Sequence, residues 1–456
     1  MNAVKGCFTD KGFLKTFVML SVPIAMQNLL TTGVNLLDNV MIGKLGEAAI
    51  ASVSLANQVF FVLSLILFGV CSGCSVFISQ FHGKGDEDSI RKMVAVNMIA
   101  GVLVSGVFTA AAILFPHALM RIFSPDDAEV VELGVGYLRI IAFSYAPMAI
   151  SFAFSFALKS TARPKIPLVL AAVSLVCNGT LNYILIFGAF GISAMGVRGA
   201  ALATTITRVV ELALTLLIVY IRIPALAVRL GDVLAVTREF IVRFFRTAIP
   251  VILNETMWGL GVCMYSVVYG RMGTDVVAAV NIAATVERLL NIFMIGMGNA
   301  TAVMIGREMG RSNFALAKEY AARFSALSII LGALIGVALV GISPVALKLF
   351  DVSGEVVHMA YQILFVIAVI MILRNYNHTH IVGTLRSGGD TRFCLLLDGV
   401  VVWAISLPLV WMAGLWWRLP IGVVYTMFFA EETVKIFLIH HRLKKGNWVN
   451  NLVENL

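Results

Sequence analysis

The sequence predicts an all-α polytopic membrane protein with twelve transmembrane helices in two six-helix bundles related by a parallel internal repeat. Three observations predict this fold: a hydrophobic share of 60% against a charged share of 13%, long apolar runs between short polar breaks, and a first half that recurs in the second. A soluble chain of 456 residues could not bury so much apolar surface. A transmembrane β-barrel would instead show alternating segments of about 10 residues.

The apolar runs define the predicted spans. Each is long enough for a helix to cross a bilayer. The first run follows the polar segment "MNAVKGCFTDKGFLK", with no short apolar stretch and cleavage site between them, so we expect no cleavable signal peptide. The twelve runs are 14–40, 50–78, 94–115, 132–157, 167–188, 197–221, 244–269, 276–305, 322–346, 355–382, 393–414 and 419–440.

The basic residues predict the orientation. With the N-terminus in the cytoplasm, most Lys and Arg between spans fall on the cytoplasmic side, and the acidic "SPDDAEVVE" falls on the other. The positive-inside rule then places both termini of this multi-pass protein in the cytoplasm. The net charge of +9 therefore reflects topology, and we expect no nucleic-acid partner. We expect a monomer in the lipid bilayer.

The two halves repeat at an offset of 227 residues (250 − 23), set by Pro23 and Pro250 and kept by Gly83 and Gly310. Each half has six predicted helices, an even number, so the repeat is parallel and its pseudo-twofold axis follows the membrane normal. The predicted domains are a cytoplasmic tail (1–12), an N-lobe (13–221), a cytoplasmic linker (222–239), a C-lobe (240–440) and a second cytoplasmic tail (441–456).

Catalytic and redox motifs are not apparent. The sequence contains no H-E-x-x-H, G-x-S-x-G or P-loop, so we expect a transporter rather than an enzyme. Cys71 and Cys74 form a C-x-x-C, but the surrounding "GVCSGCS" favours a small-residue face for close helix packing over a redox site. No disulfide framework is implied.

Polar residues that the repeat does not share are the functional candidates, because polar groups at membrane depth are costly. Asp38 corresponds to Tyr265, and it continues a stripe of one helix face that holds Gln27 and Asn35. Ser174, Asn178 and Asn182 form a second stripe, whose repeat partners are apolar. The alternative for Asp38 is a solvated carboxylate near the helix end.

Together these stripes predict one cation site. Carboxylate, amide and hydroxyl oxygens suit Na⁺, and the carboxylate could also carry a proton. We therefore expect Asp38, Asn178 and Asn182 to bind the coupling ion and to be the Na⁺ ligands if the ion is Na⁺. Thr204 is a further candidate on the next helix.

The second half predicts contacts for an organic cation. Glu255 replaces Asn28 and shares a helix face with Trp258 and Tyr265, an arrangement that favours charge and cation–π attraction. Glu255 is also one candidate counter-charge for Arg374. The predicted residues of a substrate cleft are Glu255, Trp258, Tyr265, Asn35, Gln27, Arg288, Asn375 and Asn377.

Several segments together resemble the multidrug and toxic compound extrusion (MATE) family over nearly the whole chain. They are "LLDNVMIGKLG", "NGTLNYILIFG…GVRGAALATTI" and "GTLRSGGDT". The resemblance implies an antiporter that exports organic cations and amphipathic drugs in exchange for Na⁺ or H⁺, with no resident cofactor.

Within the family, the chain is similar to the NorM-type branch. The family's acid on the first helix falls on Asp38, its polar pair on Asn178 and Asn182, and the branch's acid on the seventh helix falls on Glu255. An acid common on the tenth helix is replaced by Asn375. The alternatives are a flippase for a lipid-linked precursor from the same wider superfamily and, from other classes, a membrane enzyme or receptor.

Overall fold

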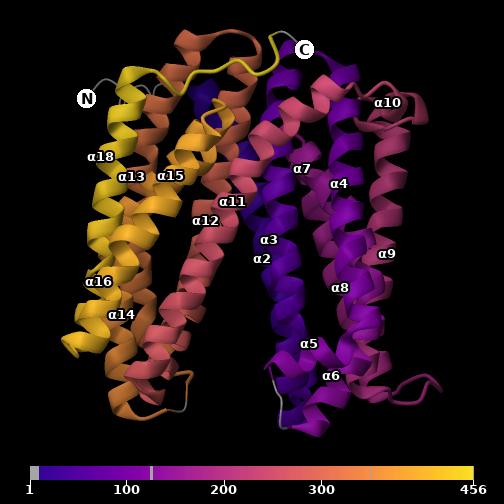
Figure 1. The fold of residues 1–456 in the computed structure, drawn as a ribbon, viewed down its shortest axis with the longest axis vertical. Coiled ribbons are helices and arrows are strands. Elements are labelled where there is room, and N and C mark those ends of the chain that lie inside the picture. Colours follow the sequence, from indigo (N-terminus) through magenta and orange to yellow (C-terminus); the bar gives the residue numbers. More distant parts are fainter. Residues whose placement is uncertain (1–9, 124–126, 351, 455–456) are drawn as a thin grey trace. The chain divides into compact units, whose positions relative to one another are not determined.

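The computed structural model describes residues 10–123, 127–350 and 352–454, and it contains helices and no strands in these ranges (Figure 1). The chain divides into two compact units. The N-terminal unit comprises Met26–Ile78 and Asp86–Phe244. The C-terminal unit comprises Met1–Ala25, Ser79–Gly85 and Phe245–Leu456.

The N-terminal unit contains most of the first two long helices and the next seven helices. Its helices are α2 (Lys11–Gly43, from Met26), α3 (Glu47–Lys84, to Ile78), α4 (Glu87–Leu114), α5 (Pro116–Phe123), α6 (Ala128–Ile141), α7 (Tyr145–Ser160), α8 (Lys165–Phe187), α9 (Gly196–Arg222) and α10 (Leu230–Leu234). The 3₁₀ turn η1 (Ala142–Ser144) lies between α6 and α7, and η2 (Pro224–Leu226) lies between α9 and α10.

The C-terminal unit contains the ends of α2 and α3 and the second half of the chain. Its helices are α11 (Arg238–Met272, from Phe245), α12 (Thr274–Gly310), α13 (Phe314–Leu347), α14 (Gly354–His378), α15 (Thr391–Val401), α16 (Leu407–Trp411), α17 (Ile421–Thr426) and α18 (Phe428–Lys445). Three π-helical segments interrupt them: η3 (Thr379–Leu385), η4 (Val402–Ser406) and η5 (Met412–Trp416).

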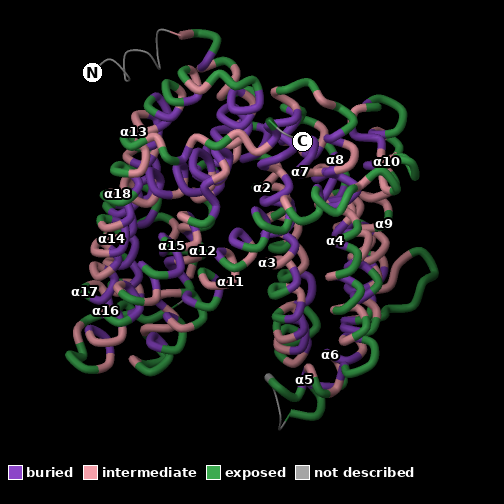
Figure 2. Tube along the Cα trace, turned by 45° about the horizontal axis from the view of Figure 1, so that its top comes forward, coloured by how far each residue is buried: buried purple, intermediate pink, exposed green. Residues whose placement is uncertain are grey.

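Eleven helices of the described residues are long and apolar enough to cross a membrane. They correspond to the first eleven predicted spans. The predicted twelfth span, 419–440, is formed by α17 and α18, and α18 carries buried Glu431, Glu432 and Lys435 within its length. On α4, the exposed residues include Leu103 and Val107, 66% and 68% exposed, as expected of a surface that faces lipid (Figure 2).

A reciprocal glycine contact reflects the predicted pseudo-twofold relation. A Cβ on Gly83 of α3 would lie 2.0 Å from the carbonyl oxygen of Arg307, and a Cβ on Gly310 of α12 would lie 1.8 Å from that of Gln80. Gly83 corresponds to Gly310 in the repeat, and Gln80 to Arg307. Two repeat-related helix ends thus cross backbone to backbone, which requires glycine at both positions.

The end of α3 therefore packs with the C-terminal half of the chain. The predicted domain bounds, which put all of α3 in the N-lobe, stay a prediction. Cys71 and Cys74 are both buried free thiols on α3. The Sγ of Cys74 lies 3.3 Å from the carbonyl oxygen of Met93 on α4, in agreement with a packing role for this face.

Candidate functional site

The candidate ion site lies in the N-terminal unit, where α8 presents one buried polar face. Ser174, Asn178 and Asn182 lie four residues apart, and all three are buried. Their spacing places them on successive turns of the same side of α8. The predicted stripe on this helix is therefore present.

Four side chains from three helices form a continuous hydrogen-bonded chain. Asn182 Nδ2 donates to Asp38 Oδ1 of α2 and, at 3.0 Å, to Asn178 Oδ1. Asn178 Nδ2 donates to Thr204 Oγ1 of α9 at 3.4 Å. We call Asp38, Asn178, Asn182 and Thr204 the polar cluster.

Thr204 differs from its neighbours on α9. Thr205 and Thr207 each donate to the carbonyl oxygen four residues earlier, at 2.8 Å, as threonines in helices commonly do. Thr204 instead accepts a bond from the polar cluster. Thr204 thus differs in role from Thr205 and Thr207.

The polar cluster suits a small cation. Within the described residues, Asp38 forms no ion pair. Asn182 is fully buried, and no described donor reaches its Oδ1 atom. A partly buried carboxylate beside a buried acceptor without a donor is a favourable setting for Na⁺ or a proton. The residues fit the predicted ion, and their role in coupling stays a prediction.

Two other predicted residues of α2 lie apart from the cluster's hydrogen bonds. Gln27 Nε2 donates to Ser155 Oγ of α7 at 3.3 Å, and Asn35 is exposed. The stripe on α2 thus includes residues of different environments.

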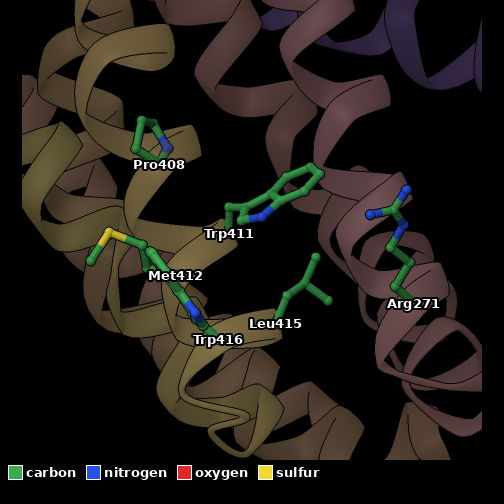
Figure 3. A pocket seen from close by; sticks show the side chains of 6 residues that line it. All are labelled: Arg271, Pro408, Trp411, Met412, Leu415 and Trp416. Atoms are coloured by element: carbon green, nitrogen blue, oxygen red, sulfur yellow. The ribbon is translucent and has the colours of Figure 1, made fainter.

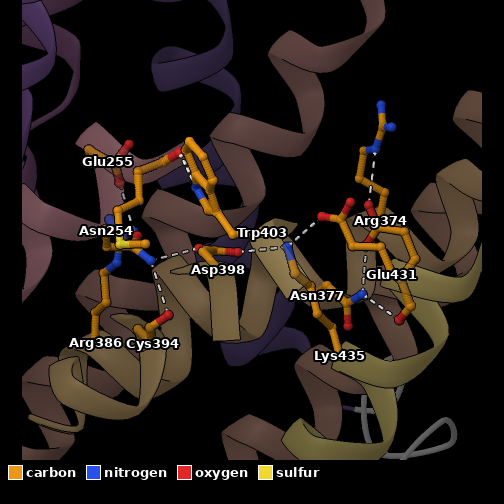
Figure 4. A network of polar contacts seen from close by, with 12 residues as sticks. Asn254, Glu255, Arg374, Asn377, Arg386, Cys394, Asp398, Trp403, Glu431 and Lys435 are labelled. Atoms are coloured by element: carbon orange, nitrogen blue, oxygen red, sulfur yellow. Dashed lines mark hydrogen bonds and ion pairs between the residues drawn. The ribbon is translucent and has the colours of Figure 1, made fainter. Parts of the chain in front are cut away.

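Glu255 has a partner that the sequence did not predict. Its Oε1 atom lies 2.7 Å from Arg386 Nη2, in an ion pair between α11 and the residue that follows η3 (Figure 4). The suggestion that Glu255 neutralises Arg374 is wrong. Arg374 pairs instead with Glu287 at 2.6 Å and Glu432 at 3.3 Å, because α12 and α18 pack beside α14.

A buried ionic network extends from this pair through the C-terminal unit (Figure 4). Asn254 accepts from Arg386 and donates to Asp398 Oδ2 at 2.9 Å. Lys435 Nζ then bridges Asp398 Oδ1 at 2.7 Å and Glu431 Oε1 at 2.8 Å. We call the set the ionic network: Asn254, Glu255, Glu287, Arg374, Asn377, Arg386, Asp398, Glu431, Glu432 and Lys435.

Sequence reasoning missed Asp398 as a member. The signal was present, since Asp398 interrupts the apolar run "CLLLDGVVVW" and corresponds to Ala171 in the repeat. Glu431 and Lys435 pair with each other, and Glu432 pairs with Arg374, so these three residues of α18 form structural ion pairs.

The other predicted substrate residues have mixed environments. Trp258 is 48% exposed, and Arg288 is exposed. Tyr265 is buried and its hydroxyl donates to Glu431 Oε2 at 3.4 Å. The two asparagines are buried in helix contacts: Asn375 donates to the Ser328 carbonyl at 2.6 Å, and Asn377 to Glu432 Oε2 at 2.7 Å. Contact with substrate stays a prediction for all of them.

A sequence comparison decides the family. The MatE family model matches this chain twice, over residues 23–184 and 250–412. The chain belongs to the MatE family. The two matches begin at the prolines that set the internal repeat, so the family unit itself is duplicated.

Curated relatives of this MatE protein span nearly its full length. An uncharacterized transporter, YisQ, of Bacillus subtilis is 23% identical, and the match covers 95% of each chain. Probable multidrug resistance proteins named NorM are 23% identical in Thermotoga maritima, covering 94% of this chain and 93% of the relative, and 28% identical in Rhizobium meliloti, covering 89% of each. These relatives confirm the resemblance to the NorM type.

Solved structures confirm the fold. A crystal structure of MATE in complex with MaL6 aligns with a TM-score of 0.84 at 20% identity, over 95% of this chain and 97% of that one. An outward-facing MATE family transporter aligns with a TM-score of 0.84 at 18% identity, over 97% of each. The twelve-helix fold of two bundles is therefore confirmed, and the protein is a multi-pass membrane transporter of the MatE family.

Proposed function

We propose that this MatE protein is a secondary active antiporter that exports organic cations and amphipathic drugs in exchange for Na⁺ or H⁺. The observation that carries the proposal is the polar cluster, a partly buried carboxylate with buried amide neighbours, a nearby hydroxyl and no ion-pair partner among the described residues. The names of the NorM relatives support the substrate class. The proposed setting is the bacterial inner membrane, with both termini in the cytoplasm.

The proposed cycle couples the ion to the drug through alternating access. Na⁺ or H⁺ enters at Asp38 in the outward-facing state and favours release of the drug, and its departure to the cytoplasm permits drug binding there. Such coupling requires that ion and drug favour different conformations.

The movement of one ion per cycle supplies enough free energy to export the drug against a gradient. Moving one charge down a potential of 100 mV supplies about 2.3 kcal/mol, which corresponds to roughly a fifty-fold drug gradient. The proposal therefore needs only one cation-binding carboxylate, and Asp38 supplies it.

Glu255 is the proposed contact for a cationic drug. Its side chain is 14% exposed, and its Oε1 atom pairs with Arg386. A drug cation would approach beside that ion pair, with the exposed Trp258 on the same helix available for a cation–π contact. We attribute the transport of cationic drugs to Glu255 and Trp258.

Uptake into everted vesicles tests the proposal. With an imposed Na⁺ or H⁺ gradient, we expect the wild-type protein to accumulate an organic cation such as ethidium, and Asp38→Asn to lose nearly all ion-driven uptake. Asp275→Asn, which alters an exposed acid in the first turn of α12, should transport normally. Normal ion-driven uptake by Asp38→Asn would contradict the proposal. Glu255→Gln should impair cationic drugs more than neutral ones.

A further inference from the structure

A cavity of about 550 Å³ in the C-terminal unit shares no lining residue with either polar site described above. It opens between the end of α11 and the consecutive segments α16 and η5 (Figure 3). Its lining combines one cation, two indoles and apolar side chains: Arg271, Pro408, Trp411, Met412, Leu415 and Trp416.

The cavity lies at the ends of two candidate spans. Arg271 is the second-last residue of the span Arg238–Met272, and Trp416 is the last residue of the span Thr391–Trp416. Trp and Arg at span ends are typical of the boundary between hydrocarbon and headgroups. Trp416 is 78% exposed, an exposure that is unfavourable in water and favourable at this boundary.

Arg271 is available to an anion. Its guanidinium lies 5.4 Å from the centre of the Trp411 ring, and it forms no ion pair within the part of the chain that the structure describes. A guanidinium presents a planar fork of donors that matches a phosphate group. Stacking on the indole would hold that fork in place at the cavity wall.

The same contact occurs in the first repeat in weaker form. Lys44 corresponds to Arg271, and its ammonium lies 5.9 Å from the centre of the Phe187 ring. Both repeats therefore place a cation over an aromatic ring where the first helix of the repeat ends. Only the second repeat supplies a guanidinium and indole rings.

We propose that this cavity binds an anionic phospholipid. The phosphate binds Arg271, the glycerol region lies against Trp411 and Trp416, and an acyl chain follows Met412 and Leu415 toward the hydrocarbon. Charge complementarity selects an anionic headgroup over a zwitterionic one, and the apolar wall selects a lipid over a soluble phosphate.

Lipid titration of the purified protein tests the proposal. Bound lipids are counted by native mass spectrometry with phosphatidylglycerol, phosphatidylcholine and soluble glycerol phosphate as separate additions. The wild type should retain one tightly bound phosphatidylglycerol, and Arg271→Gln should bind it about fivefold more weakly, the effect of one surface cation on an anionic lipid. Arg418→Gln is the matched control, because it alters an exposed arginine shortly after η5 that does not line the cavity.

Equal retention by the wild type and Arg271→Gln would overturn the proposal, as would an equal loss in Arg418→Gln or equal binding of glycerol phosphate. A second measurement keeps Arg271, so its result does not depend on whether Arg271→Gln folds. Brominated phosphatidylglycerol should quench tryptophan fluorescence more than brominated phosphatidylcholine, and Trp411→Phe with Trp416→Phe should remove that difference. Equal quenching by both lipids would also overturn the site.

Discussion

The polar cluster and part of the ionic network occupy corresponding positions in the two repeats. They differ in whether the carboxylate has a cationic partner in the structure. In the first repeat the acid is Asp38 on α2, and the hydroxyl is Thr204 on α9. In the second, the hydroxyl is Tyr265 on α11 and the acid is Glu431 on α18. The offset of the repeat pairs Asp38 with Tyr265 and Thr204 with Glu431.

The cations explain the difference. Arg208 corresponds to Lys435, so both repeats carry a cation one helical turn beyond Thr204 or Glu431. Arg208 forms an ion pair with Glu211 at 2.8 Å. In the second repeat Leu438 takes the place of Glu211, so Lys435 has no such partner one turn further along its helix. Lys435 binds Glu431 and Asp398 instead. A fixed cation thus neutralises the acid of the second repeat, whereas Asp38 has no ion-pair partner among the described residues and, in our proposal, binds the mobile cation.

The largest expected effect comes from removing the fixed cation. Lys435→Met leaves Asp398 and Glu431 buried without their shared partner, and breaking a buried ion pair in this way costs about 3–5 kcal/mol. We expect a large fall in the thermal unfolding temperature in detergent. Adding Asp398→Asn to Lys435→Met should restore part of the stability, and a single variant as stable as the wild type would show that the network contributes little.

A smaller effect should follow from making the first repeat resemble the second. Glu211→Leu frees Arg208, which can then turn toward Asp38 and compete with the mobile cation. We expect about a tenfold rise in the ion concentration that half-saturates transport, since one charge contact near a partly exposed site contributes about 1.4 kcal/mol. An unchanged half-saturating ion concentration would contradict this explanation of the difference between the two repeats.

The smallest expected effect lies at the start of α2. The Arg323 guanidinium donates to Asp10 and holds the pKa of that carboxyl below its usual value, and the Phe13 amide adds to the effect. Asp10 therefore stabilises the folded state above the unfolded pKa, and this contribution is lost as the pH falls through the lower, folded pKa. Asp10→Asn keeps the helix cap but not the charge, so it should cost less than about 1 kcal/mol at pH 7.

Thermal unfolding as a function of pH checks this prediction. The difference between the wild type and Asp10→Asn should shrink as the pH falls below 3.8. A difference that is constant with pH would mean that the charge of Asp10 does not contribute.

Sequence patterns predicted the fold and the polar face of the first repeat well, because regular helices keep the period on which a stripe depends. The polar face of α8 is the clearest case, and its repeat partners are apolar. In the second repeat three π-helical segments interrupt the described helices, and each shifts the helical phase. Arg386 follows the first of these, so its pairing with Glu255 could not be read from α-helical spacing. Arg374 and Glu287 lie on regular helices, but their pairing depends on how α12 packs beside α14, which the spacing within one helix does not give.

Ion binding to the purified protein tests the central claim most directly. Binding of radioactive Na⁺ and drug-induced proton release are measured on the wild type, on Asp38→Asn, and on Lys435→Met with Asp398→Asn, which removes one charge of each sign from the ionic network. The account predicts that the wild type shows one of the two signals, that Asp38→Asn shows neither, and that the double variant keeps the wild-type signal. A signal that survives in Asp38→Asn and disappears in the double variant would place the coupling ion in the second repeat and contradict the account.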